Sequence, residues 1–453
     1  MLAQPRPESQ AQPMTTQQDT TQKNSAAVAR RNVPILAGQG AFNMMAWSMA
    51  SPSIVLAFLA ISLDLPMFLA GLLVTIRHGA GTLADIFASD SIARLSRKKG
   101  AIICMDIAVA VCFLLVVVVT LQGDRTATIA AFVIAIFMIG VLEEIKAMLI
   151  VDFVSDNMDR RSRMQVSYVQ KAIGGAGTIA LVLLVHQLMQ DAPALSRHST
   201  VVILGVLCFV LSAVSMLAFR ETAISAGAAP TPGDRKPWAP TGFLIRACDL
   251  FVEPWFRRFM VIRLSFVVVG LSVPFFALIA AEAHHSSAKG LTALIISSAA
   301  AVLVATPLWR VLNGFSLKLV MAVAALMVAV TGCALVALHY AGIDHDIHVH
   351  AVSLFLVTIA VTGLGGARSL YFMEVAPKEQ RVAAKAVSTS LARIAIVAIS
   401  AALAAVAHSA EVAWAIVFIT LVSLLAALLS FWIIPVSATE NAPQEAEPEP
   451  KTH

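Results

Sequence analysis

The sequence predicts an all-α integral membrane protein with twelve transmembrane helices. Of its 453 residues, 58% are hydrophobic and only 13% are charged, whereas soluble domains have roughly 45–50% apolar and about 25% charged residues. Long apolar runs recur along the whole chain, and a bilayer core about 30 Å thick needs roughly 20 apolar residues per helix. Lipid offers the backbone no hydrogen-bond partner, so each run is predicted to be a helix.

The apolar runs follow one another without a soluble-looking domain between them. The predicted spans are residues 33–61, 66–88, 100–121, 127–150, 165–189, 200–219, 258–280, 290–312, 317–338, 351–374, 384–407 and 412–434. Residues 1–32 are rich in Gln, Thr and Pro, and residues 435–453 are acidic and contain Pro. Both ends are therefore predicted to be disordered cytoplasmic tails.

The basic residues orient the spans, because Lys and Arg collect in cytoplasmic loops. Of the 32 basic residues, only Arg125, Arg197 and Lys289 fall in loops on the side opposite the amino terminus. Both termini are thus predicted to be cytoplasmic, in the plasma (inner) membrane of a bacterium. The basic balance reflects this topology and anionic lipid headgroups, and it does not indicate nucleic-acid binding.

An internal repeat predicts two six-helix halves, residues 33–219 and 258–434, joined by a Pro-rich cytoplasmic linker at 220–257. Four positions recur at an offset of 222 residues, with Pro52, Lys146, Asp152 and Lys171 matching Pro274, Arg368, Glu374 and Arg393. A shift by six spans keeps the orientation, so the halves are parallel. Each repeated proline is predicted to kink the first helix of its half.

Two local motifs connect this organisation to a known family. The segment from Tyr371 to Arg381 (YFMEVAPKEQR) is similar to the pattern Y-x-x-E-x-A-P-x-x-x-R at the inner end of helix ten in the major facilitator superfamily. Residues 89–98 (SDSIARLSRK) resemble that superfamily's G-x-L-x-D-R-x-G-R-K loop only in their basic residues. With parallel halves and a long linker, the resemblance covers residues 33–434.

The resemblance implies a secondary active transporter that works by alternating access, as a monomeric unit and without a cofactor. It does not imply an enzyme. It also implies ion pairs at the inner helix ends that lock the inner side while the outer side is open. The predicted members of this gate are Arg94, Asp152, Arg160, Arg161, Arg310, Glu374 and Arg381. Lipid-headgroup anchoring would explain the basic members but not the repeated acid.

Charged groups inside the spans are candidates for substrate binding or coupling, because each costs at least about 2.5 kcal/mol on insertion scales and therefore usually faces a cavity or a partner. These candidates are Arg77, His78, Asp85, Glu143, Glu144, Lys146, Lys171, Arg368 and Arg393. Glu143 and Lys146 are spaced to pair as i and i+3 neighbours, which leaves Glu144 unpaired. Glu144 or Glu143 is the predicted proton carrier, because burial raises the pKa of a carboxylate toward neutrality. Purely structural pairing is the alternative.

The same groups suggest a coupling ion and a substrate charge. His78 and Asp85 lie on one face of the second span, and a histidine beside a carboxylate suits a proton-coupling step near neutral pH. Lys171, Arg368 and Arg393 are expected to line the central cavity together with Arg77, and cations there favour an anionic solute. Equally, these bases could neutralise the in-span carboxylates and leave little net charge.

A His-rich outer segment supports a rival class of function. Residues 341–350 (AGIDHDIHVH), with His284, His285 and His339, invite a polytopic membrane enzyme with a periplasmic His/Asp metal site. The spacing matches no specific zinc signature, so no metal site is predicted. A non-transporting receptor or scaffold on the same fold is a third hypothesis, because a fold does not fix function.

Overall fold

The computed structural model describes residues 14–93, 95, 98–158, 160–219, 247–287, 289–313, 316–377 and 380–432, and every regular element in these ranges is helical. Residues 1–13, 220–246 and 433–453, which include most of the predicted linker and carboxy-terminal tail, lie outside the described residues. Of the predicted amino-terminal tail, residues 14–32 belong to the first helix instead. An Ala- and Gln-containing segment can extend an existing helix without a new nucleation cost.

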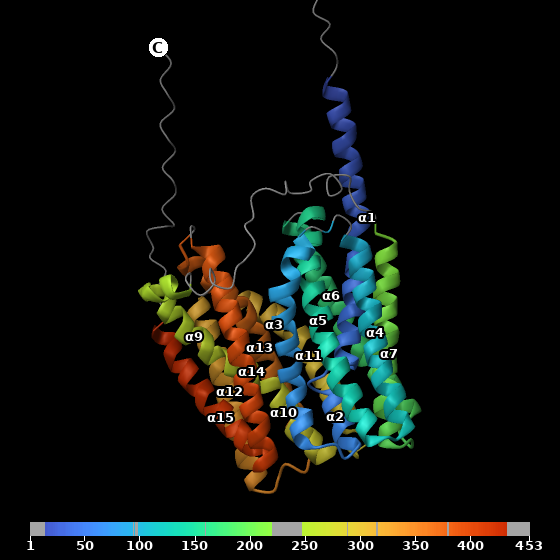
Figure 1. Cartoon of the computed structure of the whole chain (residues 1–453), viewed down its shortest axis with the longest axis vertical. Coiled ribbons are helices and arrows are strands. Elements are labelled where there is room, and N and C mark those ends of the chain that lie inside the picture. Colours follow the sequence, from blue (N-terminus) through green and yellow to red (C-terminus); the bar gives the residue numbers. More distant parts are fainter. Residues whose placement is uncertain are drawn as a thin grey trace, which may run out of the picture.

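The helices pack as two groups (Figure 1). The first group comprises α1 (Met14–Met49), α2 (Val55–Ser62), α3 (Met67–Ala93), α4 (Lys98–Gln122), α5 (Arg125–Asn157), α6 (Arg160–Leu188) and α7 (Ala194–Leu217). The second comprises α9 (Pro254–Gly270), α10 (Ser272–His284), α11 (Gly290–Asn313), α12 (Leu317–Tyr340), α13 (Ile347–Val375), α14 (Arg381–Ser409), α15 (Val412–Leu429) and the short η1 (Ser430–Trp432). The groups meet mainly where α3 packs on α14 and α6 packs on α11.

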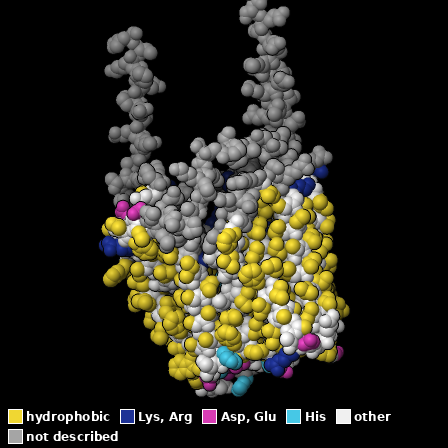
Figure 2. Space-filling model, viewed as in Figure 1, with side chains coloured by type: hydrophobic (Ala, Val, Ile, Leu, Met, Phe, Trp, Pro, Cys, Tyr) yellow, Lys and Arg dark blue, Asp and Glu magenta, His cyan; other side chains and the backbone are white. Residues whose placement is uncertain are grey.

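Within the described residues, eleven helices are long and apolar enough to cross a membrane. One of them is the α9–α10 pair, counted as a single stretch from Pro254 to His284. The predicted first span, residues 33–61, comprises the end of α1, a break and α2. A total of twelve spans therefore stays a prediction. Figure 2 shows an outer surface dominated by hydrophobic side chains, as lipid contact requires.

The two repeated prolines lie at helix interruptions. The chain leaves the α-helical conformation between Met49 and Val55, around Pro52, and α9 gives way to α10 at Leu271, three residues before Pro274. Proline lacks an N–H group and its ring clashes with the preceding turn, so both breaks have a local cause. The first crossing of each group is thus built from two helical segments.

The end of the bundle at which α1 begins is called the inner end here, following the distribution of basic residues, and the opposite end is called the outer end. Figure 1 shows the loop between α12 and α13 at the outer end. Figure 2 shows a hollow between the two groups in which Lys and Arg side chains are visible. Charged side chains also lie at both ends of the bundle in this view, whereas the sides that face lipid are mainly hydrophobic.

Close packing of α3 on α5 predicts the effect of one substitution. A Cβ atom added at Gly140 would collide with the Arg77 carbonyl oxygen and lie 2.9 Å from the Ala80 Cβ. Gly140→Ala should therefore destabilise the protein by about 1–3 kcal/mol, the usual cost of overpacking, seen as a lower melting temperature in detergent. Gly365→Ala is the control, because nothing lies within 4 Å of its added Cβ. Equal melting temperatures for the two variants would contradict this packing.

Candidate functional site

The candidate site lies along the seam formed by α3 and α14, which run antiparallel and belong to different groups. Toward the outer end, the Thr75 Oγ1 and Ser400 Oγ atoms are 2.8 Å apart and share a hydrogen bond. Nearby, a Cβ added at Gly71 would lie 2.9 Å from the Ala404 Cβ. Small residues bring the backbones together here, as they do at other helix interfaces in membranes. This seam, from Gly71 and Ala404 inward, sets the position of the charged residues that follow.

Arg393 links the two groups through a pair of carboxylates. From α14 its guanidinium donates to Asp85 on α3 and to Glu144 on α5. The three side chains are 18%, 31% and 24% exposed, respectively, so the contact is partly shielded from solvent. Two carboxylates held at one guanidinium leave a net negative charge in a region where charge is costly. Neutralising or replacing either carboxylate would therefore change how strongly the groups are held together.

A second ion pair lies beside the first, within the first group. The Arg77 Nε atom donates to Glu143 Oε2 at 2.7 Å, and a terminal guanidinium nitrogen donates to Oε1 at 2.5 Å. This is the bidentate geometry that makes arginine–carboxylate pairs strong. The Arg77 guanidinium also lies 5.0 Å from the centre of the Trp47 ring. Arg77 is therefore paired with a carboxylate, which agrees with the alternative that the in-span bases neutralise the in-span acids.

The predicted Glu143–Lys146 pair is wrong. Lys146 instead donates to Asp106 on α4, a residue whose side chain is fully buried. Asp106 also accepts hydrogen bonds from Ser212 at 3.0 Å and Asn43 at 3.3 Å. The i, i+3 spacing permitted the local pair, but a buried carboxylate with several donors binds the ammonium more favourably than a half-exposed one. Glu144 is likewise not unpaired, because it contacts Arg393.

Asp106 was not among the sequence candidates. The sequence could have identified it, because Asp106 is a lone aspartate within the apolar part of the predicted third span, KKGAIICMDIAVAVCFLLVVVV. An acid at this depth needs a partner. Asp85 was expected to act with His78, but its carboxylate pairs with Arg393.

Three cations of the second group have no acidic partner among the described residues. Arg263 on α9 donates to the Ser388 carbonyl at 2.9 Å and to Thr389 Oγ1 at 3.3 Å. Arg368 on α13 and Lys385 on α14 lie close enough to Arg263 for their charges to act on one another. Of these, only Arg368 was a sequence candidate. We call Arg263, Arg368 and Lys385 the cation cluster.

The predicted inner gate is only partly described. Arg94 and the side chains of Asp152, Arg160 and Arg161 lie outside the described residues. Arg310 on α11 stacks on the Tyr168 ring of α6, with 5.4 Å from its guanidinium carbon to the ring centre, and so joins the two groups. Arg381 donates to the Ala376 carbonyl at 2.9 Å, and Glu374 is exposed. In the described part of the chain, none of these three forms an ion pair.

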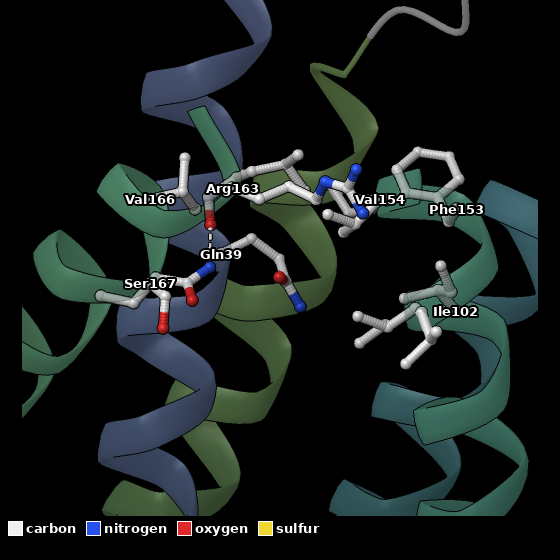
Figure 3. A pocket seen from close by; sticks show the side chains of 12 residues that line it. Gln39, Ile102, Phe153, Val154, Arg163, Val166 and Ser167 are labelled. Atoms are coloured by element: carbon white, nitrogen blue, oxygen red, sulfur yellow. Dashed lines mark hydrogen bonds between the residues drawn. The ribbon is translucent and has the colours of Figure 1, made fainter. Parts of the chain in front are cut away.

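A cavity of about 320 Å³ lies within the first group near its inner end (Figure 3). Its walls are mostly apolar and come from α1, α4, α5, α6 and α7, with Gln39, Ser167 and Arg163 among the polar side chains. Gln170 donates to the Leu36 carbonyl at 2.8 Å across it. The predicted candidate Lys171 follows Gln170 on α6 and is half-buried. All residues that line this cavity belong to the first group, so it does not lie on the path between the two groups.

The outer histidines are organised around one aspartate. A ring nitrogen of His339 lies 2.6 Å from the Asp344 carboxylate, and His350 Nε2 lies 3.1 Å from the Asp344 carbonyl oxygen. Burial alone would raise the pKa of Asp344, but hydrogen bonding and charge from His339 outweigh it, so this pKa is held below its ordinary value. Among the described residues, no three His, Cys, Asp or Glu side chains are arranged to bind a metal ion.

Comparisons of the sequence with known proteins find distant mycobacterial relatives. No family model matches the chain. An uncharacterized protein of Mycobacterium tuberculosis and one of Mycobacterium bovis are each 23% identical to it over 295 residues. The match covers 64% of this chain and 56% of each relative. The chain thus spans little more than half the length of these mycobacterial proteins.

Solved structures share the fold over most of the chain. A POT family transporter in complex with a conjugated peptide aligns with a TM-score of 0.67, a nucleoside transporter with 0.65 and a D-xylose-proton symporter with 0.64. Each is 12% identical and the alignment covers 89% of this chain and 96%, 100% and 98% of those structures, respectively. These are transporters of the major facilitator type, so the chain has that fold.

The buried Asp106–Lys146 pair leads to a stability prediction. Asp106→Asn should destabilise the protein by about 3–5 kcal/mol, because it leaves the Lys146 ammonium buried without a counter-charge. The double variant Asp106→Leu with Lys146→Met should recover much of this loss, since it removes both charges. Unfolding in detergent–denaturant mixtures measures both. A double variant no more stable than Asp106→Asn would contradict the role assigned to the pair.

Proposed function

We propose that this chain is a secondary active transporter of a bacterial plasma membrane, which moves a small anionic solute by alternating access and couples that movement to protons. The observation that carries the proposal is the bridge from Arg393 to Asp85 and Glu144, which joins the two helix groups. The major facilitator fold supports a transport role, and the mycobacterial relatives support a bacterial setting. The rival membrane enzyme has less support, because His339 and His350 of the outer segment are engaged with Asp344.

In the proposed mechanism, Arg393 exchanges partners. Protonation of Asp85 or Glu144 removes the negative charge that holds the guanidinium and weakens the bridge. The freed guanidinium can then bind the anionic group of the solute in the same bidentate way. Protons and an anion thereby become linked at one side chain. The neighbouring Arg77–Glu143 pair remains closed and supports α3 and α5 during this exchange.

Alternating access also requires the α3–α14 seam to change. At its outer end the seam is held by the Thr75–Ser400 hydrogen bond and by the close approach at Gly71. Opening the outer side would separate these contacts, while the Arg310–Tyr168 contact joins the groups near the inner end. We propose that twelve spans in two parallel six-helix halves, with both termini cytoplasmic, carry out this movement as a monomer.

Coupling can be tested in proteoliposomes that contain a pH-sensitive dye and receive a panel of carboxylate- and phosphate-bearing solutes. The wild type should move protons together with a transported solute. Glu144→Gln and Asp85→Asn should each reduce this proton movement strongly but allow solute exchange without a pH gradient, because neutral side chains cannot carry the proton. Lys318→Gln is the control, since Lys318 donates to the Phe431 carbonyl away from the bridge.

Full proton movement in the Asp85→Asn, Glu144→Gln double variant would end the coupling proposal. If no solute in the panel crosses the membrane, a receptor or scaffold role replaces the transporter.

The seam offers a test of alternating access. After replacement of the five native cysteines, a Thr75→Cys, Ser400→Cys variant should cross-link on oxidation, because the native side-chain oxygens are only 2.8 Å apart. Cross-linking should stop solute uptake, and reduction should restore it. Each single cysteine variant serves as a control. Unchanged uptake by protein shown on gels to be cross-linked would mean that the seam does not open.

A further inference from the structure

The internal repeat allows the cation cluster of the second group to be compared with the corresponding position of the first group. Arg368 corresponds to Lys146 at the 222-residue offset. In the first group, Lys146 is neutralised by Asp106 on α4. The corresponding helix of the second group is α12, whose sequence LKLVMAVAALMVAVTGCALVALHY contains no acidic residue. The cation is thus repeated, whereas the carboxylate that would neutralise it is not.

The charges of Arg263, Arg368 and Lys385 act on one another. Lys385, Thr389 and Arg393 are four residues apart on α14 and therefore share one face of that helix. Arg263 reaches this face, where it donates to Thr389 Oγ1 at 3.3 Å, between Lys385 and Arg393. The charges that act on Arg263 include those of Arg368 and Arg393. A row of cations therefore extends from the inner end of α14 to the bridging Arg393.

Contacts with aromatic rings do not neutralise this row. Lys385 lies 5.5 Å from the centre of the Phe372 ring, and Arg263 lies 5.9 Å from that of Phe259. Such contacts contribute about 0.5–2 kcal/mol but supply no negative charge. Arg263 is only 7% exposed, so solvent offers it little compensation. An anion that arrives between the two groups would supply the negative charge that no described carboxylate supplies to the cluster.

We propose that the cation cluster is a second anion subsite, so that the transported solute carries two separated anionic groups. One group would bind Arg393 and the other would bind Arg263, Arg368 and Lys385. Eight residues of α14 separate Lys385 from Arg393, which corresponds to about 12 Å along the helix at 1.5 Å per residue. A linear dicarboxylate of the adipate type has the right chemistry and can extend along this row. The inference rests on the proposed transport function, from which it takes Arg393 as the first subsite.

Ligand binding to the purified full-length protein in detergent tests this proposal without any gradient. The probes are succinate, glutarate and adipate, each compared with its own monoamide, which keeps the length but removes one charge. At least one dicarboxylate should raise the melting temperature more than its monoamide does. Arg263→Gln and Arg368→Gln should weaken binding of that dicarboxylate by about tenfold or more, which corresponds to about 1.4 kcal/mol, and leave binding of the monoamide unchanged.

Two lysines of the second group provide a matched pair of variants. Lys385 and Lys318 each lie 5.5 Å from the centre of a phenylalanine ring near the inner end, but only Lys385 belongs to the cluster. Lys385→Gln should reduce the preference for the dicarboxylate, whereas Lys318→Gln should not. Arg263→Lys keeps the charge and should retain the preference, which separates loss of charge from loss of folding.

Several results would overturn the second subsite. They are equal binding of each dicarboxylate and its monoamide, the absence of any response to the dicarboxylates, or an unchanged preference in the Arg263 and Arg368 variants. A melting response to phosphatidylglycerol in mixed micelles, without one to dicarboxylates, would assign the cluster to a lipid headgroup instead. If the binding assay shows no preference for the dicarboxylate, proton-coupled uptake in proteoliposomes can still occur. If the uptake assay shows no proton coupling, the preference for the dicarboxylate in the binding assay can still hold.

Discussion

The cost of an isolated charge in a low-dielectric region controls the arrangement of this protein. Each described carboxylate at the centre of the bundle has a cationic partner: Asp106 has Lys146, Glu143 has Arg77, and Asp85 and Glu144 share Arg393. Two of these sets are internal to the first group, and only the third crosses to the second. Charge compensation thereby both stabilises the first group and connects it to its neighbour.

The pairings divide the charged residues by role. Asp106 and Lys146 are buried and fully engaged, so their contribution is to hold α4 and α5 together. The Arg393 bridge is partly exposed and draws its partners from two helices of the other group. A contact of this kind can be broken at smaller cost, because water or a solute can replace the lost partner. The proposed coupling therefore rests on Arg393, whereas Lys146 supports the packing of α4 and α5.

The sequence predicts an all-helical membrane protein and the location of most of its helices, because apolar length reflects the thickness of the bilayer directly, whereas the total of twelve spans stays a prediction. The interruptions near Pro52 and Pro274 were predictable as well, because proline disrupts a helix through its own local geometry. The sequence did not predict which acidic residue pairs with which basic residue. Glu143 and Lys146 have suitable spacing on one helix, yet the chosen acid is Asp106, 40 residues earlier and on another helix. Only tertiary packing decides between such partners. Arg263 and Lys385 were not predicted for the same reason, because only the packing of α9, α13 and α14 brings them near Arg368.

The Asp106–Lys146 pair also affects how the chain enters the membrane. The two residues lie on α4 and α5, which are consecutive helices joined by a tight turn at Gly123, whose φ is +79°, and by the N-cap residue Asp124. Each helix alone would bring an uncompensated charge into the bilayer. Inserted together as a hairpin, Asp106 and Lys146 neutralise each other, and only Glu143 and Glu144 of α5 depend on Arg77 and Arg393 of other helices. Biogenesis of the first group should therefore favour simultaneous partitioning of these two helices over their stepwise release from the translocon.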